Sequence, residues 1–264
     1  MTRRGGDLNV RLIFLGTAAA FVTDIDNYQS NMLLQSDNGR LLLIDCGTDA
    51  RRSLHVLGFS HRDIADVYLS HLHADHAGGL EWLAFSRKFD EQTLPKPRLY
   101  LNENLVKPLW EHTLSGGLTS LTDEPASLSA YFKVHPIKDE AGFRWEGVYF
   151  RLIKNRHIAS KFAHMPSYGL RFKVNDRVIF LTTDAQFQPD HSLRDYQKAD
   201  LIFQDCETAP IHSGVHAHYQ QLKTLDPAIK AKMWLYHYNN QVKLPDAKAD
   251  GFGGFVVPGQ TFDL

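Results

Sequence analysis

The chain has 264 residues, of which 43% are hydrophobic, so it is long enough and apolar enough to bury a sizeable core. Its formal net charge of −1 leaves no overall field that would draw it to a nucleic acid or to an anionic membrane. These properties exclude a disordered chain and disfavour a strongly basic nucleic-acid-binding protein. We expect a single domain over residues 1–264.

Two cysteines bear on the cellular compartment. Cys46 and Cys206 both lie within apolar stretches that we expect to be strands. Isolated buried thiols fit a reducing compartment better than a disulfide framework. We therefore expect a cytoplasmic protein in which neither cysteine acts as a nucleophile.

The N-terminus is similar to an export signal in one respect, because Arg3 and Arg4 precede an apolar run at 12–20. Against this interpretation, Arg11 stands at the edge of the run, and a second strand at 31–35 follows instead of a cleavage site and linker. No stretch approaches the roughly 18 to 20 apolar residues that a transmembrane helix requires. We expect neither a cleaved signal nor a membrane span.

The first ninety residues predict, in order, strand, loop, strand, turn, strand, helix, strand, polar loop and helix. The Asn-Gly pair at 38–39 predicts a hairpin between strands at 32–34 and 41–44. The second of these strands ends in Asp45. This carboxylate is placed either to hydrogen-bond the second nitrogen of a metal-bound histidine or to cap a helix that begins near Thr48.

The polar loop at 71–76 is the most informative stretch of the chain. It follows a strand at 65–70, precedes a helix that opens at 78–79, and contains His71, His73, Asp75 and His76. Loops at the carboxyl ends of strands face the crevice in which such folds place their chemistry. Neutral imidazole and carboxylate suit zinc, and also manganese or iron. Four candidate ligands this close together suggest two adjacent ions.

Residues 91–147 are the least informative part. We expect a strand at 98–101 and a short N-capped helix at 102–110, followed by a loop or lid through 115–117 and 122–125. His112 and His135 have no partners in the sequence pattern, so we expect surface or core positions for both. The segment is assigned no role.

Two histidines are alternative candidates for a further metal ligand. A β-prone stretch from 148 ends at His157, and His164 follows seven residues later in an expected loop. We favour His157, because a strand end holds a side chain more firmly than a loop interior does. The next strand, at 178–181, runs into Asp184, a carboxylate that can bridge two metals or serve as a helix cap.

The C-terminal part supplies the remaining candidates. A strand at 200–204 is followed by three histidines, and another strand at 232–236 delivers His237. The three histidines could form another metal site, but none has a carboxylate at ligand spacing. We therefore interpret His216 as a residue that faces the substrate and acts either as an acid or as a hydrogen-bond donor to the phosphate. We interpret His212 and His218 as supporting or surface groups.

Together these segments resemble the metallo-β-lactamase fold, and within it the phosphodiesterase branch that includes ribonuclease Z and the phage anti-defence enzymes that degrade cyclic nucleotides. The matching segments recur in the family's order across almost the whole chain: Phe14-Leu15-Gly16-Thr17, Ile44-Asp45-Cys46-Gly47, Ser70 to Gly79, His157, Ser167-Tyr168-Gly169-Leu170, Thr183-Asp184, His216 and His237. The resemblance implies an α/β architecture, an αββα sandwich of two mixed β-sheets flanked by helices.

The resemblance also implies the roles of the site residues. One divalent ion would be held by His71, His73 and His157, a second by Asp75, His76 and His237, and Asp184 would bridge the two. Zinc is the expected metal, with manganese as the alternative. A hydroxide bridging the two ions would attack phosphorus, oriented or deprotonated with the help of Asp75. His216 would stabilise charge or protonate the leaving group, and Asp45 would support the histidine ligands.

For the substrate, we favour a small phosphodiester, above all a cyclic mononucleotide. The segment 91–147 has only scattered basic residues, so nothing there is suited to grip transfer RNA. Phe162, Tyr168 and Tyr219 either stack on a base or belong to the core. The alternatives are a ribonuclease Z-like transfer RNA 3′-processing endonuclease and a lactone or thioester hydrolase. We also expect a homodimer, in which the aromatic tail after Asp250 would cover the partner's site.

Overall fold

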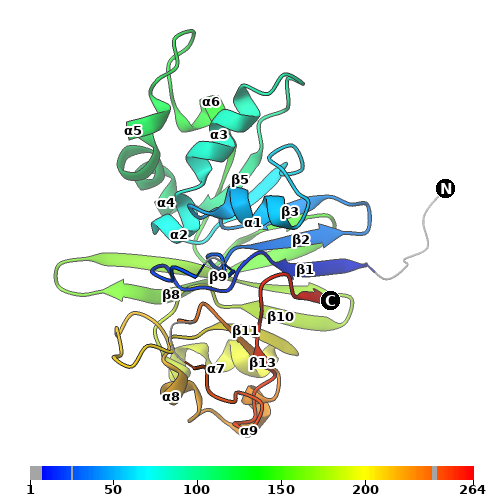
Figure 1. The fold of residues 1–264 in the computed structure, drawn as a ribbon, viewed down its shortest axis with the longest axis vertical. Helices are drawn as coiled ribbons and strands as arrows, with labels where there is room; N and C mark the ends of the chain where they lie inside the picture. The colour runs from blue at the N-terminus through cyan, green and yellow to red at the C-terminus, as the bar shows by residue number, and fades with distance from the viewer. Residues whose placement is uncertain (1–7, 25, 240–242) are drawn as a thin grey trace.

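The computed structural model describes residues 8–24, 26–239 and 243–264. They form two mixed seven-stranded β-sheets that face each other, with helices on the outer side of each sheet (Figure 1). The expected α/β class and αββα sandwich are confirmed. Arg3 and Arg4, which prompted the export-signal question, lie outside the described residues.

The first sheet is antiparallel at one edge and parallel at the other. Its strands, in spatial order, are β14 (Thr261–Asp263), β1 (Val10–Phe14), β2 (Met32–Ser36), β3 (Leu41–Ile44), β4 (Asp66–Leu69), β5 (Arg98–Asn102) and β6 (Lys133–Ile137). The pairs from β3 to β6 are parallel. The expected hairpin joins β2 to β3, and Gly39 in its turn has a φ of +80°, a conformation that glycine adopts without strain.

The second sheet has the mirrored arrangement. Its strands, in spatial order, are β13 (Gly254–Phe255), β12 (Met233–Tyr236), β11 (Leu201–Asp205), β10 (Arg177–Leu181), β9 (His164–Val174), β8 (Val148–Ala159) and β7 (Gly142–Trp145). The strands from β10 to β13 are parallel, and the others pair antiparallel. The β8–β9 hairpin projects well beyond the body of the sheet (Figure 1).

Helices cover the outer face of each sheet (Figure 1). Those over the first sheet are α1 (Ala50–Val56), α2 (Ala74–Ala77), α3 (Leu80–Lys88), α4 (Glu103–Pro108), the π-helix η1 (Leu109–Leu114), α5 (Ser115–Leu118) and α6 (Leu128–Tyr131). Those over the second are α7 (Pro189–Lys198), α8 (Tyr219–Leu222) and α9 (Pro227–Lys230). None of the helices that the structure describes is both long and apolar enough to cross a membrane.

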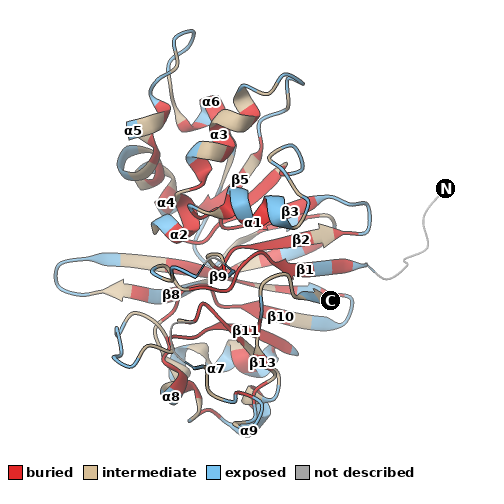
Figure 2. Ribbon diagram, viewed as in Figure 1, coloured by how far each residue is buried: buried red, intermediate tan, exposed pale blue. Residues whose placement is uncertain are grey.

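One part of the core lies between the two sheets, and further parts lie between each sheet and its helices. The ring of Phe14 in β1 has its centroid 5.3 Å from that of Phe203 in β11 and 5.5 Å from that of Tyr236 in β12. Strands β3 and β4 are buried along their whole length, as expected for parallel strands covered on both faces. Figure 2 shows buried residues running through both sheets and exposed residues on the outer helices and loops.

The expectations for residues 91–147 were only partly correct. Asn102 caps α4 as predicted, with its side chain accepting a hydrogen bond from the Asn104 backbone. The expected loop at 115–117 is instead helical, because Leu114 and Leu118 are buried and hold the backbone against α3 and η1 despite two glycines. His112 is exposed and His135 stacks on Tyr100, so both fit the expected surface or core roles.

The expected element boundaries in the second half were wrong at two places. The strand expected to end at His157 continues to Ala159, because it pairs with β9 in the long hairpin, and His164 opens β9 rather than lying in a loop. The aromatic tail after Asp250 packs on its own chain. Phe252 is 5% exposed and Val256 is fully buried, whereas Val257 is 54% exposed, and coverage of a partner's site by this segment stays a prediction.

Candidate metal centre

Five strands end at the same side of the sandwich and deliver the candidate residues there. In the first sheet, β3 is followed by Asp45 and β4 by the 71–76 loop. In the second, Asp184, Asp205 and His237 stand at the ends of β10, β11 and β12. Parallel strands that end together create this arrangement, because their carboxyl termini form one edge of the sheet.

The 71–76 loop is itself shaped by a short helix. His73 has an extended backbone and precedes α2, which carries Asp75 and His76 on its single turn. His71, Asp75 and His76 are buried at 0%, 4% and 1% exposure. Buried imidazoles and carboxylates in such density need partners, because an unpaired polar group away from water is costly.

A first group of ligand atoms comes from both sheets. His73 Nδ1 lies 3.2 Å from His71 Nε2 and 3.0 Å from His157 Nε2. The Oδ2 atom of Asp184 lies 3.6 Å from His71 Nε2 and 3.7 Å from His157 Nε2. These four residues could hold one metal ion.

A second group is formed by Asp75, His76, His237 and the same Asp184. His76 Nε2 lies 3.1 Å from Asp75 Oδ2 and 3.3 Å from Asp184 Oδ1. His237 Nε2 lies 3.3 Å from Asp75 Oδ2 and 3.6 Å from Asp184 Oδ1. Asp184 therefore turns one carboxylate oxygen toward each group.

The donor set fits divalent ions. Atoms bound at about 2.0–2.1 Å to a tetrahedral zinc ion lie about 3.3 Å apart, which matches the spacing in both groups. His76 Nε2 and Asp184 Oδ1 are buried and have no hydrogen-bond partner among the residues that the structure describes. Both atoms face the second group, and a metal ion there would supply the interaction that they lack.

Hydrogen bonds behind the two groups fix the orientation of the imidazoles. Asp45 Oδ2 lies 2.8 Å from His76 Nδ1, and the Val215 carbonyl lies 2.9 Å from His157 Nδ1. Each contact places the proton on Nδ1 and leaves the lone pair of Nε2 toward the centre. Of the two roles considered for Asp45, the helix cap was wrong, because Asp49 occupies the N-cap of α1 and Asp45 faces His76 instead.

Of the seven described non-glycine residues with a positive φ, three follow strands that lead into the centre. The φ angles are +62° at Asp45, +54° at Thr183 and +61° at His237. A β-branched residue such as threonine is unfavourable in this region, and such strain is typically found at functional sites. The strain accompanies sharp turns that direct Asp45, Asp184 and His237 toward the same space.

The surroundings of the candidate ligand histidines shift their pKa values in opposite directions. Burial, with the neighbouring histidines, lowers the pKa of His71 and of His73 and favours the neutral, ligating form. Burial also opposes the charged form of His76, but the carboxylates of Asp184, Asp75 and Asp45 outweigh it and raise the pKa of His76.

Both carboxylates of the centre are held ionised. Burial favours the neutral form of each, but it is outweighed for Asp75 by the charge of His76 and by hydrogen bonds, which lower its pKa. The neighbouring His237 and His76 likewise outweigh burial and lower the pKa of Asp184. Ionised carboxylates are the form that binds metal.

His216 has a partner that the sequence analysis missed. Its Nδ1 lies 2.9 Å from Oδ2 of Asp205, which also accepts a hydrogen bond from the Ala185 backbone. Burial opposes the charged form of His216, but the Asp205 carboxylate outweighs it and raises the pKa of His216 to about 9. These two residues, with Asp184 and His237, form a third group that could hold an ion.

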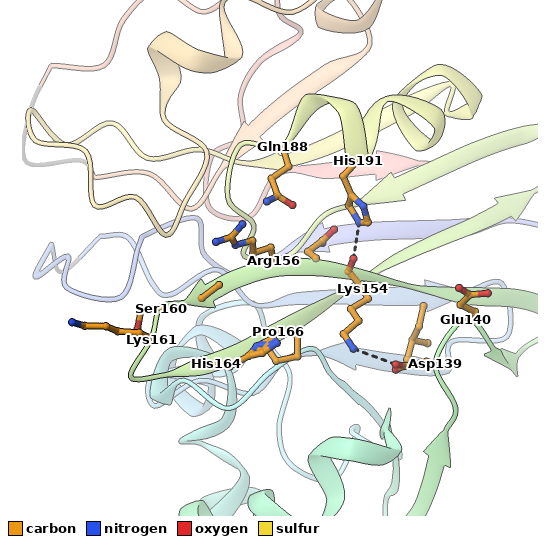
Figure 3. Close-up of a pocket in the computed structure, with 13 residues that line it drawn as sticks. Asp139, Glu140, Lys154, Arg156, Ser160, Lys161, His164, Pro166, Gln188 and His191 are labelled. Atoms are coloured by element: carbon orange, nitrogen blue, oxygen red, sulfur yellow. Dashed lines mark hydrogen bonds and ion pairs between the residues drawn. The ribbon is translucent and has the colours of Figure 1, made fainter.

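His164 does not reach the centre. It is exposed and lies beside Pro166 in a surface pocket along β8, together with Arg156 and Lys161 (Figure 3). His157, in contrast, is fully buried within the first group. Of the two histidines considered, the geometry thus brings His157 to the other candidate ligands and leaves His164 apart.

The other histidines and aromatic candidates lie away from the ligand atoms. His218 caps α8 and stacks on the exposed His212 at 3.6 Å between ring centroids. Tyr168 and Tyr219 are 1% and 2% exposed, so of the two roles considered for them the core role applies. Phe162 is the exception, at 86% exposure.

The two cysteines take no part in the centre. Cys46 and Cys206 are buried free thiols, as the apolar stretches around them predict. Burial raises the pKa of both, so neither is activated as a nucleophile.

Comparison with known proteins gives concordant matches. The family model described as Anti-Pycsar protein Apyc1 matches residues 10–262. The Anti-Pycsar protein Apyc1 of Paenibacillus harenae is 38% identical over 240 residues, which cover 89% of this chain and 91% of the relative. That of Bacillus phage 010DV004 is 33% identical over 267 residues, which cover 97% of this chain and 98% of the relative.

Solved structures share the fold at low identity. The metallo-beta-lactamase fold protein YhfI from Bacillus subtilis has a TM-score of 0.74 at 17% identity, covering 98% of this chain and 100% of its own. A diphosphatase from the PhnP family has a TM-score of 0.72 at 21% identity, covering 97% and 98%. The short form of human tRNase Z has a TM-score of 0.68 at 17% identity, covering 96% and 98%. The predicted metallo-β-lactamase fold is confirmed.

Proposed function

The chain belongs to the Anti-Pycsar protein Apyc1 family, and on that premise we propose that it is a metal-dependent phosphodiesterase that hydrolyses small phosphodiesters, above all cyclic mononucleotides. One observation carries the proposal: the two oxygens of Asp184 face two separate groups of buried ligand atoms. A carboxylate shared in this way is the expected bridge of a two-metal site.

The ligand sets follow from the two groups. His71, His73 and His157 would hold one ion, Asp75, His76 and His237 the other, and Asp184 both. Zinc is the metal that this donor set favours, with manganese as the alternative. Divalent ions bound there supply Lewis acidity and lower the pKa of a bound water toward neutrality.

Asp75 is suited to orient the attacking water. Its pKa is held low, so it is a carboxylate at neutral pH and can accept a hydrogen bond from that water. Asp75 Oδ2 lies 3.1 Å from His76 Nε2 and 3.3 Å from His237 Nε2, and these two contacts fix the orientation of the carboxylate. Of the two roles expected for Asp75, orientation or deprotonation of the nucleophile, we assign to it the orientation, because a carboxylate with a lowered pKa is a weak base.

His216 is suited to serve the leaving group. Asp205 holds the Nδ1 proton of His216, so the other ring nitrogen, Nε2, is the one that can donate toward substrate. The same contact favours the protonated imidazolium. We assign to His216 the protonation of the leaving alkoxide, with Asp205 as its positioning residue.

The preference for a small substrate over transfer RNA rests on the charge of this chain. The net charge is −1, and the segment 91–147 contains more acidic than basic residues, so the chain lacks the electrostatic attraction that a polyanion such as transfer RNA requires. The ribonuclease Z-like alternative is therefore secondary. Lactone or thioester hydrolysis remains the alternative if phosphodiesters are not cleaved.

A panel of three substrates tests the proposal. Metal-loaded protein is assayed on bis-p-nitrophenyl phosphate, on cyclic mononucleotides and on a precursor transfer RNA, with Asp75→Ala as the blank. We expect turnover of the first two with the RNA left intact. RNA cleavage without cyclic-nucleotide turnover would move the assignment to the endonuclease, and inactivity on all three would contradict a phosphodiesterase.

Cytoplasmic location and a homodimer stay predictions. Light scattering would check the homodimer.

A further inference from the structure

Three hydrophobic side chains stand almost fully exposed on segments that are linked, along the chain or by hydrogen bonds, to candidate ligands or their neighbours in sequence. Phe21, Phe162 and Ile211 are 90%, 86% and 83% exposed. Among the residues that the structure describes, the next most exposed large hydrophobic residue is Phe89 at 66%. We call Phe21, Phe162 and Ile211 the apolar rim.

The loop that carries Phe21 is anchored beside His237. The Ala19 backbone donates a hydrogen bond to the carbonyl of Tyr238, the residue after His237, at 3.1 Å. The Val22 backbone then donates to the Ala19 carbonyl at 3.1 Å, which closes a turn around Phe21. The loop is thus hydrogen-bonded at its base while it presents Phe21 to solvent.

The loop that carries Ile211 is tied to two other parts of the centre. At its start, Thr208 Oγ1 donates to the Asn239 carbonyl at 3.0 Å, two residues beyond His237. At its end, the Val215 carbonyl accepts the 2.9 Å hydrogen bond from His157 Nδ1. Ile211 therefore lies between two anchors that each adjoin a candidate ligand.

Phe162 occupies the tip of the β8–β9 hairpin, five residues beyond His157. The Ser160 backbone donates to the Ala163 carbonyl at 2.9 Å, which fixes the tight turn. Lys161 Nζ lies 4.7 Å from the centroid of the Phe162 ring, so a cation accompanies the aromatic face.

The three loops lie on the same side of the molecule, the side at which the hairpin projects (Figure 1), and they are among its exposed segments (Figure 2). Single exposed hydrophobic residues are ordinary on protein surfaces, but a group around one site indicates binding. The loops are hydrogen-bonded in place, so the exposure is not the result of an unstructured segment.

We propose that the apolar rim contacts the base of the nucleotide whose phosphodiester lies at the metal centre. This inference rests on the proposed function. A cyclic mononucleotide consists of a charged phosphate, a polar sugar and a flat base with apolar faces. Side chains without hydrogen-bonding groups, such as phenylalanine and isoleucine, suit the faces of that base. Lys161 adds a positive charge that suits an anionic substrate.

The test compares substrates with and without a base. Phe21→Ser, Phe162→Ser and Ile211→Ser, singly and combined, are assayed on 3′,5′-cyclic AMP and on the cyclic 3′,5′-phosphate of ribose that lacks a base. Phe89→Ser is the matched control, because it removes an exposed phenylalanine at the end of α3, away from the three loops. We expect the combined variant to raise KM for cyclic AMP by at least about tenfold, with kcat within about threefold. The base-free substrate and the control should be unaffected.

Several results would overturn the inference. Equal losses on both substrates would show that the rim supports the centre rather than the base, and no loss on either would show that it contacts neither. Equal losses accompanied by a fall in molecular mass in light scattering would make the rim a contact between subunits. An unmodified protein that cleaves neither substrate would contradict the proposed function itself, which is a separate result.

Discussion

Replacing Asp45 by asparagine should weaken one ion site more than the other. Asp45 is fully buried, and its carboxylate accepts hydrogen bonds from the Ser70 backbone and hydroxyl, both at 2.7 Å, and from His76 Nδ1 at 2.8 Å. Asparagine has almost the same shape and tolerates the φ of +62° found here. The backbone turn should therefore survive the substitution.

The effect arises from the tautomer of His76. An asparagine oxygen that accepts from the Ser70 backbone leaves its NH₂ group facing His76 Nδ1. That NH₂ group can only donate, so His76 Nδ1 must accept and the ring proton moves to Nε2. His76 Nε2 is the atom that faces Asp75 and Asp184 in the second group. A protonated Nε2 cannot bind metal.

The magnitude follows from comparable supporting residues. Loss of a hydrogen-bond partner behind a metal ligand typically costs about 10–100-fold in metal affinity, which corresponds to about 1.4–2.7 kcal/mol. We expect this loss in the site of Asp75, His76 and His237. The site of His71, His73 and His157 is linked to Asp45 only through the Ser70 hydroxyl, which lies 3.0 Å from His71 Nδ1, and should lose less affinity. Competition titration against a chromophoric chelator would resolve the two affinities.

A matched substitution separates this effect from general destabilisation. Asp66 is also fully buried, but it is paired with Arg98 and Arg40 at the start of β4, away from the centre. Asp66→Asn should lower the melting temperature and leave both metal affinities unchanged. Unaltered binding of both ions in Asp45→Asn, or equal weakening by the two substitutions, would refute the tautomer argument.

Three further predictions follow from the same geometry. His157→Ala should lose about one ion per chain by elemental analysis, whereas His164→Ala should keep both, and the reverse pattern would exchange their roles. Gly47→Ala should destabilise the fold by about 1–3 kcal/mol in denaturant unfolding and reduce hydrolysis, because its Cβ would lie 2.1 Å from the Asp75 carbonyl. Gly116→Ala, where nothing lies within 4 Å, is its control and should be neutral or stabilising. Chelation should lower the melting temperature, because ions that bind the folded state stabilise it, and an unchanged melting temperature would argue against bound metal.

Much of the centre could be predicted because its signals are local. The 71–76 loop places four candidate ligands within six residues, so its meaning does not depend on the rest of the fold. Asp184 and His237 each follow a short apolar run, and buried parallel strands carry such runs up to the polar residue at their end. The hairpin at Asn38-Gly39 was equally local.

The remainder depends on contacts between distant residues. Asp205 lies eleven residues before His216, and their pairing follows from where β11 ends relative to the loop that returns to the centre. The sequence favoured His157 over His164, but on the expectation of a strand end that the structure does not have. The position of His157 follows instead from the register of the long hairpin, in which a bulge lies between Arg156 and Ile158. The sequence did not predict the burial of Phe252 either, because this burial also depends on contacts between residues that are distant in the sequence.

A metal titration of hydrolysis tests the central claim most directly. Protein freed of metal by chelation is supplied with zinc or manganese in measured equivalents, and the rate of cyclic-mononucleotide hydrolysis is recorded at each step, with Asp75→Ala as the blank. The two-ion centre around Asp184 predicts that the rate rises until about two equivalents per chain are bound. A rate that is complete at one equivalent, or hydrolysis that persists without metal, would contradict it.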